Sequence, residues 1–204
     1  MTIDAKQVKS LREATGAGMM ECKKALLETA GDEQKALILL REKGLAGAKK
    51  LAGRATKEGL VDSYIHPNNR VGVLVEINCE TDFVARNEVF EQLVHDVAMH
   101  IAASSPSFVE PEDVPEEILE RERQIYKTQA LAEGKPEKFV EKIIEGRLRK
   151  FYEQFCLMEQ PFIKEPEISV RELVTRTIAS TGENIGIRRF TRYQLGEELP
   201  CESE

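Results

Sequence analysis

The stretch NCETDFVARNE, residues 78–88, places an acidic and a large aromatic side chain next to each other, where an apolar run gives way to a helical pattern. Asp82 and Phe83 have opposite requirements, because a carboxylate favours water and a phenyl ring favours burial. In one interpretation, Thr81 or Asp82 caps a helix and Phe83 turns into the core. In the other, the residues form a projecting tip that inserts Phe83 into a partner protein, where Asp82 acts on a nearby charge.

The remaining patterns that could carry chemistry are weaker. The segment TGAGMMECKK, residues 15–24, does not match G-x-x-x-x-G-K-[ST] and follows no strand pattern, so it predicts no nucleotide-binding loop. His95 and His100 lack the i, i+4 spacing of a zinc-binding helix, and we interpret them as a helix-surface histidine and one near a helix end. Glu80 and Asp82 are a weak acid–base pattern. The sequence therefore predicts a binding protein with no catalytic residues, metal or cofactor, rather than an enzyme.

Two methionines follow the glycine-containing break at residues 15–18. Met19 fits the apolar stripe of the following helix, so packing in a small core is the simpler interpretation for it. Met20 fits that stripe less well, and beside Lys23 and Leu11 it would offer a partner an adaptable apolar contact ringed by charge.

Composition limits the class of protein. At 204 residues and 41% apolar composition, the chain can form one good core with smaller appended parts, which predicts one or two domains. No apolar run approaches the roughly 18 residues of a membrane span, and MTIDAKQVKS lacks the apolar segment of a secretion signal, so we expect a cytoplasmic protein without a membrane partner. The cysteines lack metal-binding spacing and are expected to be reduced, the first three packed and the last exposed: Cys22, Cys79, Cys156 and Cys201.

Charge is unevenly distributed along the chain. Residues 1–59 hold 12 Lys and Arg against 8 Asp and Glu, which leaves 17 against 28 for the remainder of the total of 29 and 36. An acidic body repels phosphate backbones, and a weakly basic N-terminal segment provides few of the contacts that nucleic-acid affinity requires. We therefore expect a protein partner and no direct contact with nucleic acid.

Helical spacing covers the N-terminal part of the chain. Residues 1–44 are expected to form a compact three-helix domain, with Val8 and Leu11 on one face of the first helix. Gly31 is expected to end the second helix, Asp32 to cap the third, and Gly44 to end it. Residues 45–59, rich in Gly, Ala and Lys, are expected to form a solvated and partly helical linker.

The pattern then changes to the alternation of strands, which predicts an α+β fold with a small antiparallel sheet. One strand ends and the next begins at the turn HPNNR, residues 66–70. The alternating residues are Val61, Ser63 and Ile65 before the turn and Val71, Val73, Val75 and Ile77 after it. An amphipathic helix from Glu88 ends before Pro106, with its apolar stripe at Phe90, Leu93 or Val94, Val97 and Ile101. Residues 60–114 form the first part of this core in our interpretation. Residues 161–196 form its last part, with a helix capped by Ser169 and a third strand after it, and residues 197–204 form a loose acidic tail.

Residues 115–160 are predicted to form a protruding helical hairpin. Two apolar stripes flank the breaker-containing segment EGKPEK and are expected to pack on each other. The first stripe comprises Ile118, Ile125 and Ala132, and the second comprises Val140, Ile144, Leu148, Phe151 and Phe155.

Four separated motifs resemble the bacterial translation elongation factor Ts family: LREATGAGMMECKKAL at 11–26, INCETDFVARNEVF at 77–90, VAMHIAASSPSF at 97–108 and EGRLRKFYEQFCLMEQPFI at 145–163. The similarity runs from about residue 5 to about residue 196. It implies a guanine nucleotide exchange factor for elongation factor Tu, bound in its GDP-loaded and nucleotide-free forms. It also implies a ubiquitin-associated-like N-terminal domain and a coiled-coil projection at the helical hairpin.

The resemblance also assigns two sets of partner-binding residues. The docking surface of the N-terminal domain corresponds here to Leu11, Arg12, Met19, Met20 and Lys23. The tip that intrudes near the magnesium site corresponds to Thr81, Asp82, Phe83 and Val84. Longer family members carry two related core halves and this chain has room for one, so we expect a homodimer. The alternative function is a non-catalytic scaffold associated with translation.

Overall fold

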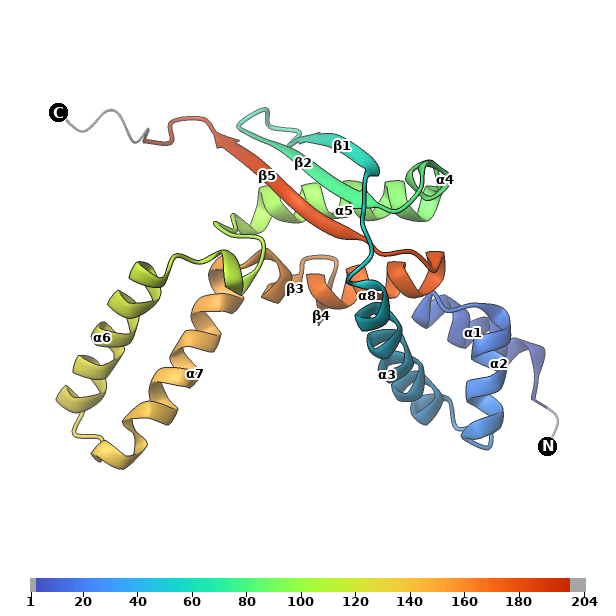
Figure 1. The fold of residues 1–204 in the computed structure, drawn as a ribbon, viewed down its shortest axis with the longest axis horizontal. Coiled ribbons are helices and arrows are strands. Elements are labelled where there is room, and N and C mark those ends of the chain that lie inside the picture. The colour runs from blue at the N-terminus through green and yellow to red at the C-terminus, as the bar shows by residue number, and fades with distance from the viewer. Residues whose placement is uncertain (1–2, 199–204) are drawn as a thin grey trace. The chain divides into compact units, whose positions relative to one another are not determined.

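The computed structural model describes residues 3–198, which fall into two compact units. One unit contains the N-terminal helices together with Leu74–Ala98 and Glu172–Thr191, and the other contains Ile65–Val73 and Met99–Arg171. The elements are α+β in class, as the sequence predicts, with helices and small antiparallel sheets (Figure 1).

Three helices form the N-terminal bundle: α1 Ala5–Thr15, α2 Met19–Glu28 and α3 Glu33–Leu51. Asp4 caps α1 in a capping box with Gln7, and the side chain of Asp32 caps α3 by accepting from the backbone N–H of Lys35 at 3.0 Å. The predicted three helices and the predicted cap are confirmed. Their core consists of Val8, Leu11, Cys22, Ala25, Leu26, Ala36 and Leu40.

Helix α3 is longer than the sequence predicts, because it continues through Gly44 to Leu51. The expectation that Gly44 ends this helix is wrong. A glycine inside a helix costs about 1 kcal/mol relative to alanine, which is too little to end a helix that continues with Ala, Lys and Leu. A Cβ at position 44 would make an ordinary van der Waals contact with the Cβ of Ala179 at 3.8 Å, so the packing here does not require glycine.

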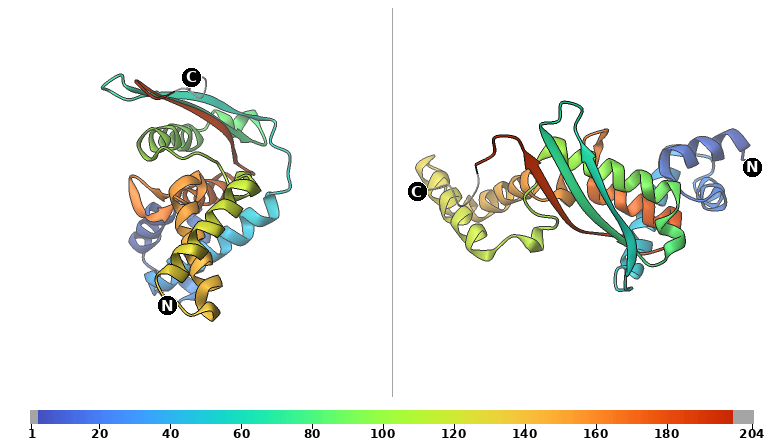
Figure 2. Two further views of the ribbon diagram at one scale, coloured as in Figure 1. Left: turned by 90° about the vertical axis from the view of Figure 1, so that its left-hand side faces the viewer. Right: turned by 90° about the horizontal axis from the view of Figure 1, so that it is seen from above.

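Strands β1 Glu58–Ile65, β2 Val71–Cys79 and β5 Gly186–Gln194 form a sheet in the order β1-β2-β5. The predicted hairpin and the predicted third strand are confirmed. Helix α5, Glu88–Ser104, covers one face of this sheet (Figures 1 and 2). Alternation buries Val73, Val75, Ile77 and Cys79 of β2, and the predicted inward stripe of α5 is buried at Phe90, Leu93, Val94, Val97 and Ile101.

Several short elements were not predicted. Strands β3 Pro161–Phe162 and β4 Glu165–Ser169 form a two-stranded antiparallel sheet before helix α8, Val170–Thr181. Single 3₁₀ turns occur at η1 Pro111–Asp113 and η2 Leu157–Glu159. These strands and turns have two to five residues, which is too short to show an apolar period. Helix α4, Asp82–Ala85, lies where the capping interpretation places a helix start.

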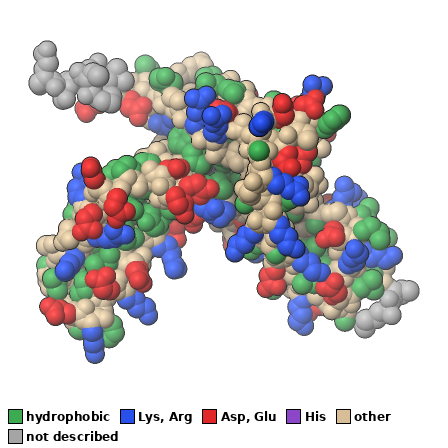
Figure 3. All heavy atoms as spheres, viewed as in Figure 1, with side chains coloured by type: hydrophobic (Ala, Val, Ile, Leu, Met, Phe, Trp, Pro, Cys, Tyr) green, Lys and Arg blue, Asp and Glu red, His purple; other side chains and the backbone are tan. Residues whose placement is uncertain are grey.

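The helical hairpin consists of α6 Glu116–Ala132 and α7 Glu137–Phe155. Acidic and basic side chains are interspersed over its visible surface (Figure 3). The stripe predicted on α7 is buried at Val140, Ile144, Leu148 and Phe151. The stripe predicted on α6 is right only at Ile118, which packs on the core of the hairpin, because Ile125 and Ala132 are exposed. Leu119 and Ala130 are buried instead, and Tyr126 packs on the same cluster. An aromatic ring, which the sequence analysis did not count, therefore takes the place of the expected isoleucine.

The three cysteines within the described residues are free and buried, as expected: Cys22, Cys79 and Cys156. Burial raises the pKa of all three thiols, and that of Cys156 to about 11. Cys201 and most of the predicted acidic tail lie outside the described residues. Within residues 3–198, no helix is long and apolar enough to cross a membrane.

Candidate protein-binding site

The junction after β2 is a capped turn that exposes an aromatic side chain. Thr81 is the N-cap of α4, and its Oγ1 accepts from the backbone N–H of Val84 at 3.4 Å. Val84 and Ala85 are buried, whereas Phe83 is 83% exposed. The capping interpretation is therefore right for Thr81, but its expectation that Phe83 turns into the core is wrong.

Asp82 lies on the same exposed turn as Phe83. Its carboxylate is 3.2 Å from the guanidinium of Arg86, one helical turn further along, and the side chain of Asp82 is 49% exposed and that of Arg86 80% exposed. An exposed i, i+4 ion pair of this kind is worth only about 0.5 kcal/mol. The carboxylate can therefore exchange Arg86 for another cation or hydrogen-bond donor at little cost.

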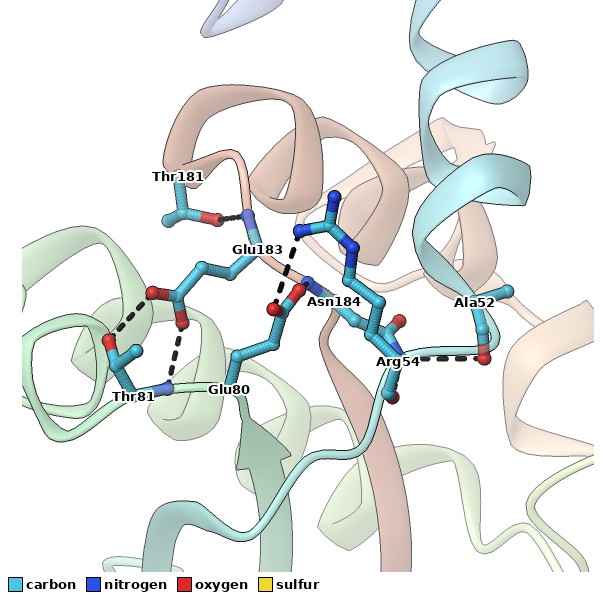
Figure 4. Close-up of polar contacts among 7 residues, drawn as sticks. All are labelled: Ala52, Arg54, Glu80, Thr81, Thr181, Glu183 and Asn184. Carbon is cyan, nitrogen blue, oxygen red and sulfur yellow. Dashed lines mark hydrogen bonds and ion pairs between the residues drawn. The ribbon is translucent and has the colours of Figure 1, made fainter.

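The turn is held by a carboxylate from the distant loop between α8 and β5 (Figure 4). One oxygen of Glu183 accepts from the backbone N–H of Thr81 at 3.0 Å, and the other accepts from its hydroxyl at 2.6 Å. Both hydrogen bonds have a charged acceptor, which makes them stronger than bonds between neutral groups. Sequence analysis did not identify Glu183 as a site residue.

A second carboxylate makes the reciprocal contact between the same two loops. Glu80 accepts from the backbone N–H of Asn184 at 2.7 Å and lies 3.4 Å from the guanidinium of Arg54. The side chain of Asn184 in turn donates to the carbonyl of Arg54 at 2.9 Å (Figure 4). Glu80 is thus engaged in structural hydrogen bonds, which leaves the weak acid–base pattern with Asp82 without support.

The sequence feature that could have indicated these two contacts is the segment TGEN, residues 181–184, which lies between a helix and a strand. Gly182 has a φ of 74°, as in a tight turn. After this turn, the side chain of Glu183 can accept hydrogen bonds, and the backbone and side-chain amides of Asn184 can donate them. The segment alone did not reveal that its partners are Glu80 and Thr81, because they lie about a hundred residues away.

The residues assigned to the docking surface of the N-terminal bundle divide into two groups. Arg12, Met19, Met20 and Lys23 are exposed, and Met20 has 64% of its surface accessible. The interpretation of Met19 as a core residue is therefore wrong. Leu11 is only 3% exposed and packs in the core of the bundle, so its side chain does not form part of the surface.

The two histidines of α5 differ in environment. His95 is exposed, as expected, and its ring makes an edge contact with Tyr64. His100 is fully buried, whereas the sequence predicted only a position near a helix end. Among residues 3–198, no group of three His, Cys, Asp or Glu side chains is arranged to hold a metal ion.

An exposed aromatic residue on a braced turn, together with exposed methionines on a helical bundle, is typical of a protein that binds another protein. A family model described as Elongation factor TS matches residues 45–197. The chain belongs to this family of translation elongation factors.

Curated relatives match almost the whole chain. The chain is 57% identical over 202 residues to elongation factor Ts of Carboxydothermus hydrogenoformans, covering 99% of this chain and 93% of the relative. It is 58% identical to the protein of the same name from Acetivibrio thermocellus, with 99% and 94% covered. It is also 58% identical to elongation factor Ts of Geobacter sulfurreducens, with 98% and 92% covered.

Proposed function

We propose that this protein is a guanine nucleotide exchange factor that binds elongation factor Tu with GDP and promotes the release of GDP. The observation that carries the proposal is the tip residue Phe83, 83% exposed on a turn that Thr81 caps and Glu183 braces. An aromatic ring exposed on a supported turn, next to the buried Val84 and Ala85, supports a role as an interface anchor. The process would take place in the cytoplasm and requires neither a covalent step nor a cofactor.

The proposed mechanism acts on the groups that hold GDP. Magnesium and backbone amides around the phosphates hold a nucleoside diphosphate, so disturbing these groups weakens its binding. Phe83 would insert between elements of elongation factor Tu, and the exposed carboxylate of Asp82 would disturb the groups and waters that position the magnesium. A ~1000-fold loss of GDP affinity requires about 4 kcal/mol of coupling, and one anchor residue supplies about 2 kcal/mol. Coupling is reciprocal, so GDP weakens the binding of this protein to the same extent.

A second contact would come from the exposed residues of the N-terminal bundle. Met19 and Met20 provide adaptable apolar surface, and Arg12 and Lys23 provide charge beside it. Leu11 supports this surface from below, since it packs in the core of the bundle. Two separate contacts of modest strength would let the bundle hold elongation factor Tu while the tip residues act on the nucleotide site.

We further propose a homodimer formed through the face of the sheet opposite α5. Val61 and Leu74 are exposed on neighbouring strands, although the alternate residues of β2 are buried beneath the sheet. A second copy would cover these side chains in a two-fold arrangement. Sedimentation of the wild type at micromolar concentration should show a dimer, and Val61→Glu with Leu74→Glu should give a monomer. A monomeric wild type would contradict this part of the proposal.

The exchange function is tested with elongation factor Tu loaded with a fluorescent GDP analogue. Catalytic amounts of wild-type protein with excess GDP should accelerate release, and the Asp82→Ala, Phe83→Ala double variant should lose most of the acceleration. Phe139→Ala, which removes an exposed phenylalanine of α7, is the matched control and should retain it. Acceleration by wild type and double variant alike would assign the mechanism to other residues. Absence of acceleration by the wild type would favour a non-catalytic scaffold.

A further inference from the structure

The position of Phe83 depends on the backbone of α4, because its exposed side chain has little packing around it. Helix α4 has four residues, which is too short for its own hydrogen bonds to keep it helical. Two features hold it: Val84 and Ala85 are buried, and Thr81 caps the first turn. The accuracy with which Phe83 is presented therefore depends on how well Thr81 is held.

The hydroxyl of Thr81 acts in both directions. It donates its one hydrogen to Glu183 at 2.6 Å, while its oxygen accepts from the N–H of Val84 at 3.4 Å. A threonine hydroxyl rotates freely unless an acceptor fixes its hydrogen. The carboxylate of Glu183 fixes that hydrogen and so orients the oxygen lone pairs, and it holds the backbone N–H of Thr81 at the same time.

Glu183 is itself held on both sides. Its backbone N–H donates to the hydroxyl of Thr181, at 3.5 Å, and the N–H of the following residue, Asn184, donates to Glu80 at 2.7 Å. The positive φ of Gly182 forms the turn that brings these groups together. Each loop thus provides a carboxylate that accepts hydrogen bonds from the other loop, Glu183 from Thr81 and Glu80 from Asn184 (Figure 4). These contacts make Glu183 a fixed support for Thr81.

We propose that Glu183 is a positioning residue for nucleotide exchange, acting through Thr81 to hold Asp82 and Phe83 in the orientation that enters the partner. The inference rests on the proposed exchange function. Misplacing a contacting group by about 1 Å can slow a reaction ~100-fold, and losing hydrogen bonds to a charged group costs a factor of ten or more. A loop without this support would need to be ordered during each encounter with elongation factor Tu.

The test compares Glu183→Ala with Glu183→Gln in the same GDP-release assay. Alanine removes both acceptors and should slow stimulated release by about tenfold to 100-fold. Glutamine retains one oxygen acceptor for the N–H of Thr81 and should restore part of the rate. Hydrogen exchange of the Val84 amide, measured on this protein alone, should become faster in the alanine variant, because the cap is no longer oriented.

Glu76→Ala is the matched control. Glu76 also accepts hydrogen bonds from two partners, Arg188 at 2.9 Å and Arg189 at 2.7 Å, but these partners lie on β5 and not in the turn that leads into α4. This variant should exchange GDP at the wild-type rate even if its thermal stability falls as much as that of Glu183→Ala. An equal loss of rate in both variants would overturn the positioning role in favour of a general loss of stability.

Combining Glu183→Ala with Asp82→Ala and Phe83→Ala distinguishes a failure of the positioning role of Glu183 from a failure of the exchange function. If Glu183 acts through Phe83 and Asp82, Glu183→Ala should change the rate of stimulated GDP release less than about twofold when both of these residues are already alanine. The effects of substitutions at residues that act through one another are not additive. A wild-type rate for Glu183→Ala, or a full additional loss in the triple variant, would overturn the positioning role. A wild type that stimulates no release would instead overturn the exchange function, while the Val84 amide would still report whether Glu183 orders the turn.

Discussion

Gly59 in β1 lies directly against the backbone of Ile77 in β2. A Cβ atom at position 59 would be 2.2 Å from the carbonyl oxygen of Ile77, and the φ of Gly59 is 144°. Side chains do not approach backbone oxygens this closely, and L-residues rarely adopt this φ. Glycine at the start of β1 thus allows the two strands to approach, and β2 leads directly into the turn that carries Phe83.

Gly59→Ala should lower the free energy of unfolding by about 3 kcal/mol, since it combines backbone strain with a collision that only movement of β1 can relieve. Urea unfolding followed by circular dichroism measures the change. Gly47→Ala in α3 is the control, because no atom beyond the local helix backbone lies within 4 Å of the new Cβ and alanine favours helix by about 0.8 kcal/mol. An unchanged unfolding midpoint for Gly59→Ala would contradict the close approach of the strands.

Leu11 and Met20 should separate stability from binding within the N-terminal bundle. Leu11→Ala leaves a cavity in the core and should destabilise the bundle by about 2–4 kcal/mol. Met20→Ala removes an exposed side chain, so it should change stability by less than about 0.5 kcal/mol but weaken binding to elongation factor Tu by about 1–2 kcal/mol. For both variants, calorimetric titration measures binding to elongation factor Tu, and hydrogen exchange of the bundle amides measures the stability of the bundle. Equal effects of the two variants on stability would contradict the burial of Leu11.

Elements with a local repeating pattern were predictable from the sequence. The alternation from Val71 to Ile77 and the helical spacing from Phe90 to Ile101 each lie in one continuous segment. The structure buries the residues of both patterns except Val71, which is half-buried. The same reasoning placed a cap at Thr81 or Asp82, and the structure shows that Thr81 is the cap. Each of these depends on neighbours within a few residues, which is the range over which a single sequence is informative.

Features that depend on distant partners were not predictable. Nothing near Thr81 indicates that Glu183 accepts both of its hydrogen bonds, and nothing near His100 indicates the side chain of Gln160. The exposure of Phe83 remained open for the same reason, since either interpretation satisfied the local pattern. Only the packing of Val84 and Ala85 decides which side of the short helix faces inward.

The corrected stripe on α6 can be tested by two substitutions in one helix. Leu119→Ala should destabilise the helical hairpin by about 2–4 kcal/mol, because Leu119 is 7% exposed within the core of the hairpin. Ile125→Ala should cost less than about 1 kcal/mol, since Ile125 is 41% exposed. Urea unfolding measures both. A larger effect at Ile125 would restore the stripe expected from the sequence.

His100 is a buried, neutral histidine with both ring nitrogens engaged. Nδ1 accepts from the backbone N–H of Ile163 at 3.2 Å, so Nε2 carries the hydrogen and donates to Gln160 at 2.9 Å. Burial lowers the pKa of His100 below its ordinary value of 6.5, while the hydrogen bond to Gln160 opposes this shift. A protonated ring would have a hydrogen on Nδ1 facing the N–H of Ile163, which makes the charged form doubly unfavourable.

Stability should therefore fall on acidification below about pH 6.5, where the unfolded state binds a proton that the folded state excludes. The contribution of His100 to the free energy of unfolding is complete above that pH. Below it, the contribution decreases by up to about 1.4 kcal/mol per pH unit, and the decrease stops at the pKa of His100 in the folded state. Urea unfolding from pH 5 to 8 should show a shallower dependence for His100→Asn, even though this variant is less stable throughout. His95→Gln, at an exposed position on the same helix, should retain the wild-type dependence. Parallel curves for the wild type and His100→Asn would show that the buried ring is not the group that titrates.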